Sequence, residues 1–227
     1  MFFKTLSEED LENYRQFFLE NDYVLLKDIL TEEGKEYLNS IEYISLKNDL
    51  IQFSRSHSIH NYDKIVAEYV NDTIDVYKKI IGEQFFKTYA FGIQYKKDNY
   101  VNPHLDLITN EVSSTTCYYS EGEYPLYISS DFIENNYNMR YSLKNHDSIP
   151  LKKRIKINIC CGDVGIFNGR NHLHWRETLK DDINYRAILS HYSYTVEGTE
   201  EYFKKLSENV PHENGINVYY PNGLPDL

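Results

Sequence analysis

Cysteine is scarce in this chain, and its spacing suits neither a disulfide framework nor a zinc site. The 227 residues include only 3 cysteines, and two of them, Cys160 and Cys161, are adjacent. A disulfide framework needs several spaced pairs, and structural zinc needs CxxC or Cys/His spacings that this sequence lacks. A disulfide-stabilised scaffold is therefore excluded, and we expect a reducing, cytoplasmic location.

Long apolar runs and an excess of positive charge are also missing. No apolar stretch approaches the roughly 20 residues that cross a membrane, and the first residues lack the apolar core of a signal peptide. Lys and Arg number 24 against 35 Asp and Glu, which gives a net charge of −11. Such a surface repels phosphate backbones and anionic lipids, so we expect neither nucleic acid nor a membrane as a partner.

Aromatic residues, in contrast, are plentiful. The sequence has 22 Tyr and 11 Phe within a hydrophobic fraction of 41%. Aromatic side chains bury large areas, so a chain of this length can form a sizeable core as a single domain spanning 1–227. The sequence carries no signal for a particular oligomeric state.

The first third of the chain predicts helices. Residues 6–21 begin with Ser7 as a candidate N-cap and continue with apolar residues at helical spacing. A second helix is expected after Thr31, and a third over 62–81 that Gly82 closes.

The remainder of the chain predicts a β-sandwich or barrel. Short runs rich in β-branched and aromatic residues alternate with Asn, Asp, Gly and Pro, which is typical of such folds. These runs cover 85–96, 112–119, 126–130, 155–161, 164–167 and 185–194. The polar, Asn-rich segment 131–150 is expected to form a long loop or lid.

One set of residues indicates a metal centre. His104 and Asp106 follow a strand-like run, and residues two apart in an extended segment point to the same side. A strand, turn and strand unit later delivers His174. Two imidazoles and one carboxylate leave three coordination positions open, as in the facial triad of non-haem Fe(II) oxygenases. Spacing alone leaves His172 as the alternative third ligand.

An arginine follows at a distinctive distance. Arg186 lies twelve residues after His174, inside the otherwise apolar run from Tyr185 to Leu189. An arginine in an apolar strand is costly unless it meets an anion. We therefore expect the Arg186 side chain to enter the barrel and bind an acid there.

Together, the HxD motif, the distal histidine and the later arginine resemble the Fe(II)/2-oxoglutarate-dependent oxygenase superfamily over roughly 85–194. The resemblance implies an α+β, mainly β protein built on a double-stranded β-helix, which is a jelly-roll, cupin-like core. We expect this catalytic core over 83–196, mostly helical support over 1–82 and a C-terminal extension over 197–227.

The resemblance also implies roles for the residues. His104, Asp106 and His174 correspond to the Fe(II) ligands. Arg186 corresponds to the residue that binds the distal carboxylate of 2-oxoglutarate, for which a guanidinium offers two parallel charged hydrogen bonds. Tyr95 corresponds to a tyrosine that often donates its hydroxyl to the same co-substrate, and packing in the core is its alternative role.

Two further residues have open assignments. Arg176 shares strand parity with His174, so it points either inward, toward the substrate or the C1 carboxylate of 2-oxoglutarate, or into a salt bridge with an acid such as Glu177. His191 lies at an odd offset from Arg186, so we expect it on the opposite face, in a structural role.

The reaction implied is hydroxylation of an unactivated C–H bond, with O2 consumed, 2-oxoglutarate converted to succinate and carbon dioxide, and ascorbate supporting the activity. Halogenation is disfavoured, because halogenating relatives replace the carboxylate ligand with a small residue and Asp106 is present. The compact chain favours a small polar metabolite as substrate, such as a free amino acid or a biosynthetic intermediate. A protein or peptide residue hydroxylase and a non-catalytic ligand-binding jelly roll are the alternatives.

Overall fold

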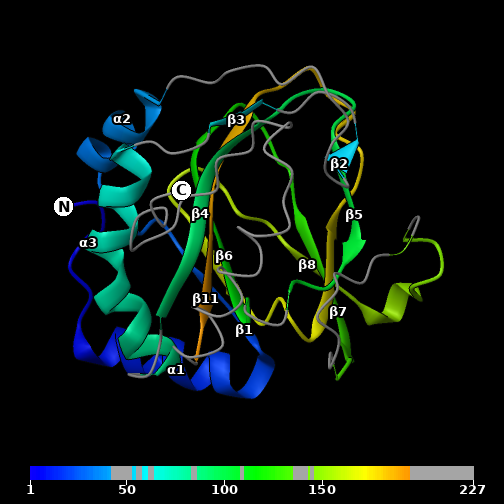
Figure 1. Ribbon diagram of the computed structural model, residues 1–227, viewed down its shortest axis with the longest axis horizontal. Coiled ribbons are helices and arrows are strands. Elements are labelled where there is room, and N and C mark those ends of the chain that lie inside the picture. The colour runs from blue at the N-terminus through cyan, green and yellow to red at the C-terminus, as the bar shows by residue number, and fades with distance from the viewer. Residues whose placement is uncertain are drawn as a thin grey trace, which may run out of the picture.

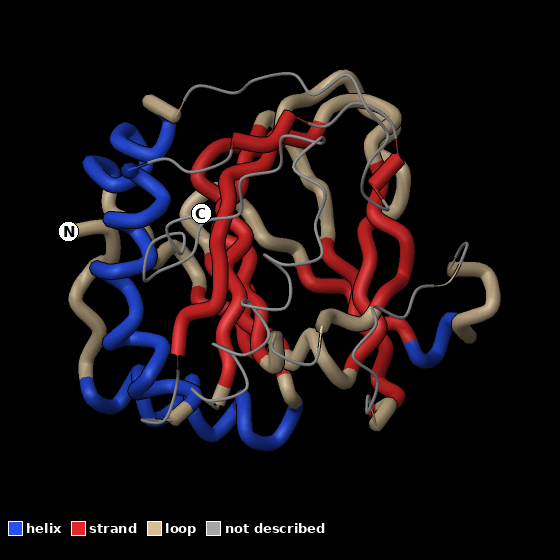
Figure 2. Tube along the Cα trace, viewed as in Figure 1, coloured by secondary structure: helices blue, strands red, loops and turns tan. Residues whose placement is uncertain are grey.

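The protein has three layers, one of helices and two of β-sheet (Figure 1). The computed structural model describes residues 1–41, 53–54, 58–60, 64–82, 86–107, 110–134, 143 and 146–194. Figure 2 shows the α-helices stacked on the outside of one sheet, with the second sheet on the other side of it. No helix in the described part of the chain is both long enough and apolar enough to cross a membrane.

The elements follow one another in an order that places most helices before most strands. They are α1 (Glu8–Asn21), β1 (Tyr23–Leu26), α2 (Glu32–Asn39), β2 (Phe53–Ser54), β3 (Ser58–His60), α3 (Lys64–Ile81), β4 (Phe86–Tyr95), β5 (Tyr100–His104), β6 (Val112–Ser120), β7 (Leu126–Phe132), the 3-10 helix η1 (Leu151–Lys153), β8 (Arg154–Ile157), β9 (Val164–Phe167), β10 (His172–Arg176) and β11 (Tyr185–Ser193).

The strands form two facing sheets. The larger sheet has 6 strands in the order β1-β9-β6-β11-β4-β3, and the smaller has 5 in the order β2-β5-β10-β7-β8. Every pairing between the described strands is antiparallel. The prediction of a mainly antiparallel double sheet supported by N-terminal helices is confirmed.

Local sequence signals explain where the helices begin and end. The Ser7 side chain accepts a hydrogen bond from the backbone of Asp10, whose side chain accepts one from the Ser7 backbone, and this capping box starts α1. The Thr31 side chain caps α2 by accepting a hydrogen bond from the backbone N–H of Gly34. Gly82 follows α3 with a φ of 148°, a conformation that glycine adopts without a steric penalty.

The helices bury one face of the larger sheet. Leu11 and Phe18 of α1 and the buried face of α3 join a core cluster with Ile166 of β9 and Ile188 of β11. Within this cluster the Tyr69 hydroxyl of α3 lies 3.0 Å from that of Tyr77 and also hydrogen-bonds Thr116 of β6. An apolar sheet face needs such cover, so the helices fix which side of the sheet is left for the barrel interior.

The first 82 residues contribute more than helical support. β1 pairs with β9 at one edge of the larger sheet, and β2 and β3 pair with β5 and β4. The sequence did not predict these three strands, because a run of two to four residues is too short to show the alternation of a strand. The predicted run 155–161 is strand only as far as Ile157, because a turn at Cys161 and Gly162 follows.

Two expectations fall wholly or partly on residues outside the described ranges. The predicted extension 197–227 lies entirely outside them. Of the predicted loop 131–150, the first two residues complete β7, and Ile149 packs against Trp175 on the outer face of the smaller sheet.

The fold predicts a contrast between two leucines of α1. Leu11 is 6% exposed and Leu19 is 58% exposed. Leu11→Ala leaves a cavity between α1 and the sheet, so the free energy of unfolding should fall by about 2–5 kcal/mol. Leu19→Ala, the matched control, should change it by less than about 0.5 kcal/mol. Equal urea midpoints for the two variants would contradict this packing.

Candidate metal centre

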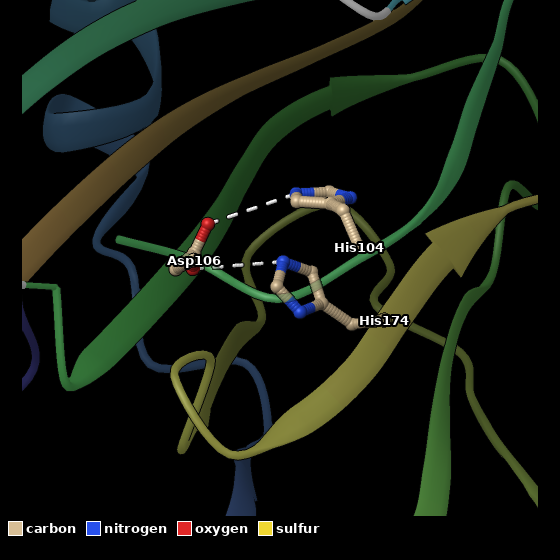
Figure 3. Close-up of side chains that lie close together, drawn as sticks. All are labelled: His104, Asp106 and His174. Carbon is tan, nitrogen blue, oxygen red and sulfur yellow. Dashed lines mark ion pairs between the residues drawn. The ribbon is translucent and has the colours of Figure 1, made fainter. Parts of the chain in front are cut away.

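Three side chains of the predicted site converge between the two sheets. β5 ends at His104, Asp106 follows two residues later, and β10 carries His174 directly opposite His104. Figure 3 shows both imidazoles turned toward the carboxylate. The His104 Nε2 lies 3.6 Å from Asp106 Oδ1, and the His174 Nε2 lies 3.5 Å from Asp106 Oδ2.

The group fits a metal ion. One donor atom from each of the three residues lies within 4.8 Å of the others, and all three residues are buried. Ligands bound at about 2.1 Å and separated by roughly right or tetrahedral angles lie about 3.0–3.4 Å apart. The two carboxylate–imidazole distances, 3.6 Å and 3.5 Å, exceed that range by only a few tenths of an ångström.

Hydrogen bonds set the tautomers of both histidines. The Nδ1 of His104 lies 2.8 Å from the carbonyl oxygen of Asn102, and the Nδ1 of His174 lies 3.1 Å from that of His172. A carbonyl only accepts, so each Nδ1 carries the proton and each Nε2 keeps its lone pair for a metal. The same bonds hold the ring planes in position.

Asp106 is oriented by two residues of the larger sheet. Ser113 of β6 donates its hydroxyl proton to Asp106 Oδ2 at 2.5 Å, and its oxygen lies 2.8 Å from His191 Nδ1. Because the serine proton is already given to the carboxylate, His191 is the donor to Ser113. His191 therefore has the expected structural role, but it faces the metal centre, and sequence reasoning gave no signal for Ser113.

His172 does not join the group. Its Nδ1 lies 2.9 Å from the carbonyl oxygen of Ser129, and its Nε2 lies 3.2 Å from a carboxylate oxygen of Asp22. Both ring nitrogens therefore have partners elsewhere. The structure brings His174, and not its alternative His172, to His104 and Asp106.

Arg176 points into the barrel. Its guanidinium carbon lies 4.7 Å from the ring centroid of Tyr185, 4.9 Å from that of Tyr124 and 5.5 Å from that of Tyr95. The alternative partner Glu177 follows the end of β10, and its carboxylate lies 3.5 Å from His146 and 3.8 Å from Arg154.

Arg186 lies on the other face of the larger sheet, which corrects the expectation that its side chain enters the barrel. On β11, Tyr185 and Ala187 join the cluster between the sheets, whereas Ile188 joins the cluster under the helices. Strand alternation puts Arg186 on the same side as Ile188, and its guanidinium carbon lies 5.2 Å from the Tyr119 ring. The spacing from His174 could not show this, because it does not reveal which residue of the strand faces inward.

Comparison with solved structures shows which known proteins share this fold. No protein-family model matches the chain, and no curated protein sequence matches it. Among solved structures, HygX from Streptomyces hygroscopicus, with nickel, 2-oxoglutarate and hygromycin B bound, is 11% identical over 83% of this chain and 87% of its own, with a TM-score of 0.59. The fold is that of the Fe(II)/2-oxoglutarate oxygenases.

Two more structures share this oxygenase fold. A prolyl hydroxylase from Trichoplax adhaerens, in complex with a hypoxia inducible factor peptide, is 10% identical over 90% of this chain and 94% of its own, with a TM-score of 0.57. The carbocyclase SnoK from nogalamycin biosynthesis is 13% identical over 93% of this chain and 96% of its own, with a TM-score of 0.55. The double-stranded β-helix predicted from the HxD pattern is thus confirmed.

Gly169 is the second contributor that sequence reasoning missed. It lies in the turn between β9 and β10, and its carbonyl oxygen accepts a hydrogen bond of 2.8 Å from the backbone N–H of Asp106. A Cβ at this position would collide with Asp106 Oδ2 and lie 2.8 Å from Ser113 Oγ. Only glycine leaves room for the Asp106 carboxylate here.

Gly169→Ala should therefore weaken metal binding. The added methyl group displaces Asp106, and lost support of a ligand typically lowers metal affinity by about 10- to 100-fold. Gly122→Ala is the control, since its Cβ would meet only the end of the Ile183 side chain, at 3.0 Å. Calorimetric titration with Mn(II) measures both, and equal affinities would contradict the close approach of Gly169 to Asp106.

Proposed function

We propose that this protein is a non-haem Fe(II)- and 2-oxoglutarate-dependent dioxygenase. The observation that carries the proposal is the buried group His104, Asp106 and His174, with both Nε2 atoms turned to the carboxylate inside an oxygenase fold. Two imidazoles and one carboxylate suit Fe(II) and leave three positions for co-substrate and O2.

The residues of this chain would bind and orient the reacting groups. When bound, Fe(II) would let O2 oxidise 2-oxoglutarate to succinate and carbon dioxide, with one oxygen atom entering succinate and the other left for C–H hydroxylation. His104 and His174 offer neutral imidazoles, and Asp106 adds the negative charge. Ser113 and His191 hold that carboxylate, while the Phe167 ring, centred 4.8 Å from the His174 ring, keeps water from one side of the site.

The presence of Asp106 favours hydroxylation over halogenation. The carboxylate occupies the ligand position that a chloride would need, and Ser113 and Gly169 are arranged around it. The default outcome proposed is therefore insertion of oxygen into an unactivated C–H bond, with desaturation and ring closure as chemically related variants.

We further propose a small polar metabolite as the substrate, such as a free amino acid or a biosynthetic intermediate. Two structures of the same fold support this: HygX was solved with hygromycin B, and SnoK is a carbocyclase of nogalamycin biosynthesis. The net charge of −11 makes a nucleic-acid substrate unfavourable.

A substrate panel tests the proposal. The protein is supplied with Fe(II), ascorbate, O2 and 2-oxoglutarate, and succinate release is measured with free amino acids, small polar intermediates and peptides. We expect stimulation by a small polar compound. Stimulation by peptides alone would make this a peptide hydroxylase, and the absence of both 2-oxoglutarate binding and succinate release would contradict the oxygenase assignment.

Asp106→Ala should abolish both metal binding and succinate release. The metal loses its one charged ligand, and two imidazoles alone do not fix its geometry. Asp131→Ala is the control, because Asp131 is exposed and its carboxylate pairs with Lys153. Metal retention and full turnover in Asp106→Ala would remove the triad from the mechanism.

A further inference from the structure

A cationic side chain is buried inside the barrel beside the metal centre. Arg176 of β10 is only 2% exposed. Its guanidinium donates to the backbone carbonyl of Tyr124 and, at 3.3 Å, to the hydroxyl of Tyr185. Those two hydrogen bonds use part of the capacity of a group with five N–H donors.

No negative charge balances this guanidinium within the described part of the chain. None of the ion pairs there involves Arg176. Its aromatic neighbours stay neutral, because burial raises the pKa of Tyr124 and of Tyr185 well above the usual range. Burial also raises the pKa of the nearby Cys117 thiol to about 12. A buried cation of this kind calls for an anionic ligand.

The position of Arg176 relative to His174 suits the distal carboxylate of 2-oxoglutarate. Arg176 and His174 are two residues apart on β10 and face the same side of the strand, with backbones about 6.6 Å apart. If one end of 2-oxoglutarate chelated a metal at this group, its second carboxylate would lie two methylene groups away, and Arg176 would be the residue to hold it. The aromatic rings around Arg176 exclude water, which strengthens a charged hydrogen bond there.

We propose that Arg176, enclosed by Tyr95, Tyr124 and Tyr185, binds the distal carboxylate of 2-oxoglutarate in place of Arg186. The assignment rests on the proposed function, since it presumes a 2-oxo acid on the metal. It moves the co-substrate arginine from β11 to β10, the strand that carries the metal ligand His174. A carboxylate belonging to the substrate is the other source of the same chemistry, and the experiment separates the two.

The test compares two acids that differ only at the distal end. In 2-oxopentanoate a methyl group replaces the distal carboxylate of 2-oxoglutarate, and the chelating end is unchanged. Calorimetric titration of the Mn(II)-loaded protein, with no turnover, measures binding of each acid. We expect the parent protein to prefer 2-oxoglutarate by at least about 30-fold, the effect of removing one partner of a buried charged pair.

Three variants complete the comparison. Arg176→Gln should lose the preference for 2-oxoglutarate while its affinity for Mn(II) and for 2-oxopentanoate stays close to that of the parent. Arg186→Gln, the matched control on the outer face, should keep the full preference. Arg176→Lys is measured as well, and it should lose much of the preference because an ammonium cannot make two parallel hydrogen bonds. If Arg176→Gln does not fold, Arg176→Lys shows whether Arg176 binds the distal carboxylate.

The outcomes separate this assignment from the proposed function. A parent protein that binds Mn(II) but neither acid would overturn both. A parent that prefers 2-oxoglutarate, with the preference intact in Arg176→Gln or in Arg176→Lys, would overturn the role of Arg176 alone, and Arg176 would then serve a substrate carboxylate. Loss of the preference in Arg186→Gln would show that Arg186 of β11, and not Arg176, binds the distal carboxylate.

Discussion

The candidate metal centre depends on the antiparallel pairing of β10 with β5, because the register of this pair sets His174 opposite His104. The site is completed from outside this pair. The turn before β10 holds the Asp106 backbone through Gly169, and Ser113 of β6 holds the carboxylate from the opposite sheet. The three candidate ligands thus come from β5, the residues just after it and β10, and the larger sheet holds the Asp106 carboxylate through Ser113.

The helices influence the site indirectly, because they pack on the larger sheet and determine which of its faces points to the interior. They cover its outer face, so the inner face of β11 is left to meet the smaller sheet. Alternation along β11 then gives each side chain one of two environments. His191 faces inward and supports Asp106 through Ser113, whereas Arg186 faces outward beside Tyr119. β11 thus supports Asp106 through His191, whereas the arginine inside the barrel, Arg176, comes from β10.

The cation that remains inside is costly to the folded chain unless it meets an anion. Aromatic rings lower that cost, since three tyrosine faces lie within cation–π distance of Arg176. Neutral tyrosines cannot cancel the charge, however. The interior thus offers a buried guanidinium and the candidate metal ligands His104, Asp106 and His174, an arrangement that would suit a small molecule with a chelating end and a carboxylate end.

The sequence by itself determined the features that depend on residue type and local spacing. Ser7, Thr31 and Gly82 predicted the helix ends, and the HxD motif with a later histidine predicted both the oxygenase fold and the three residues that the structure brings together. Tertiary structure decided that His174, and not His172, meets His104 and Asp106, and that Arg186 faces away from the barrel interior while Arg176 faces into it. A one-residue slip reverses the face of every side chain in a strand, and the register shifts around β10 and β11 come from contacts with neighbouring strands. Ser113 and Gly169 were missed for the same reason, because they approach Asp106 only across the folded barrel.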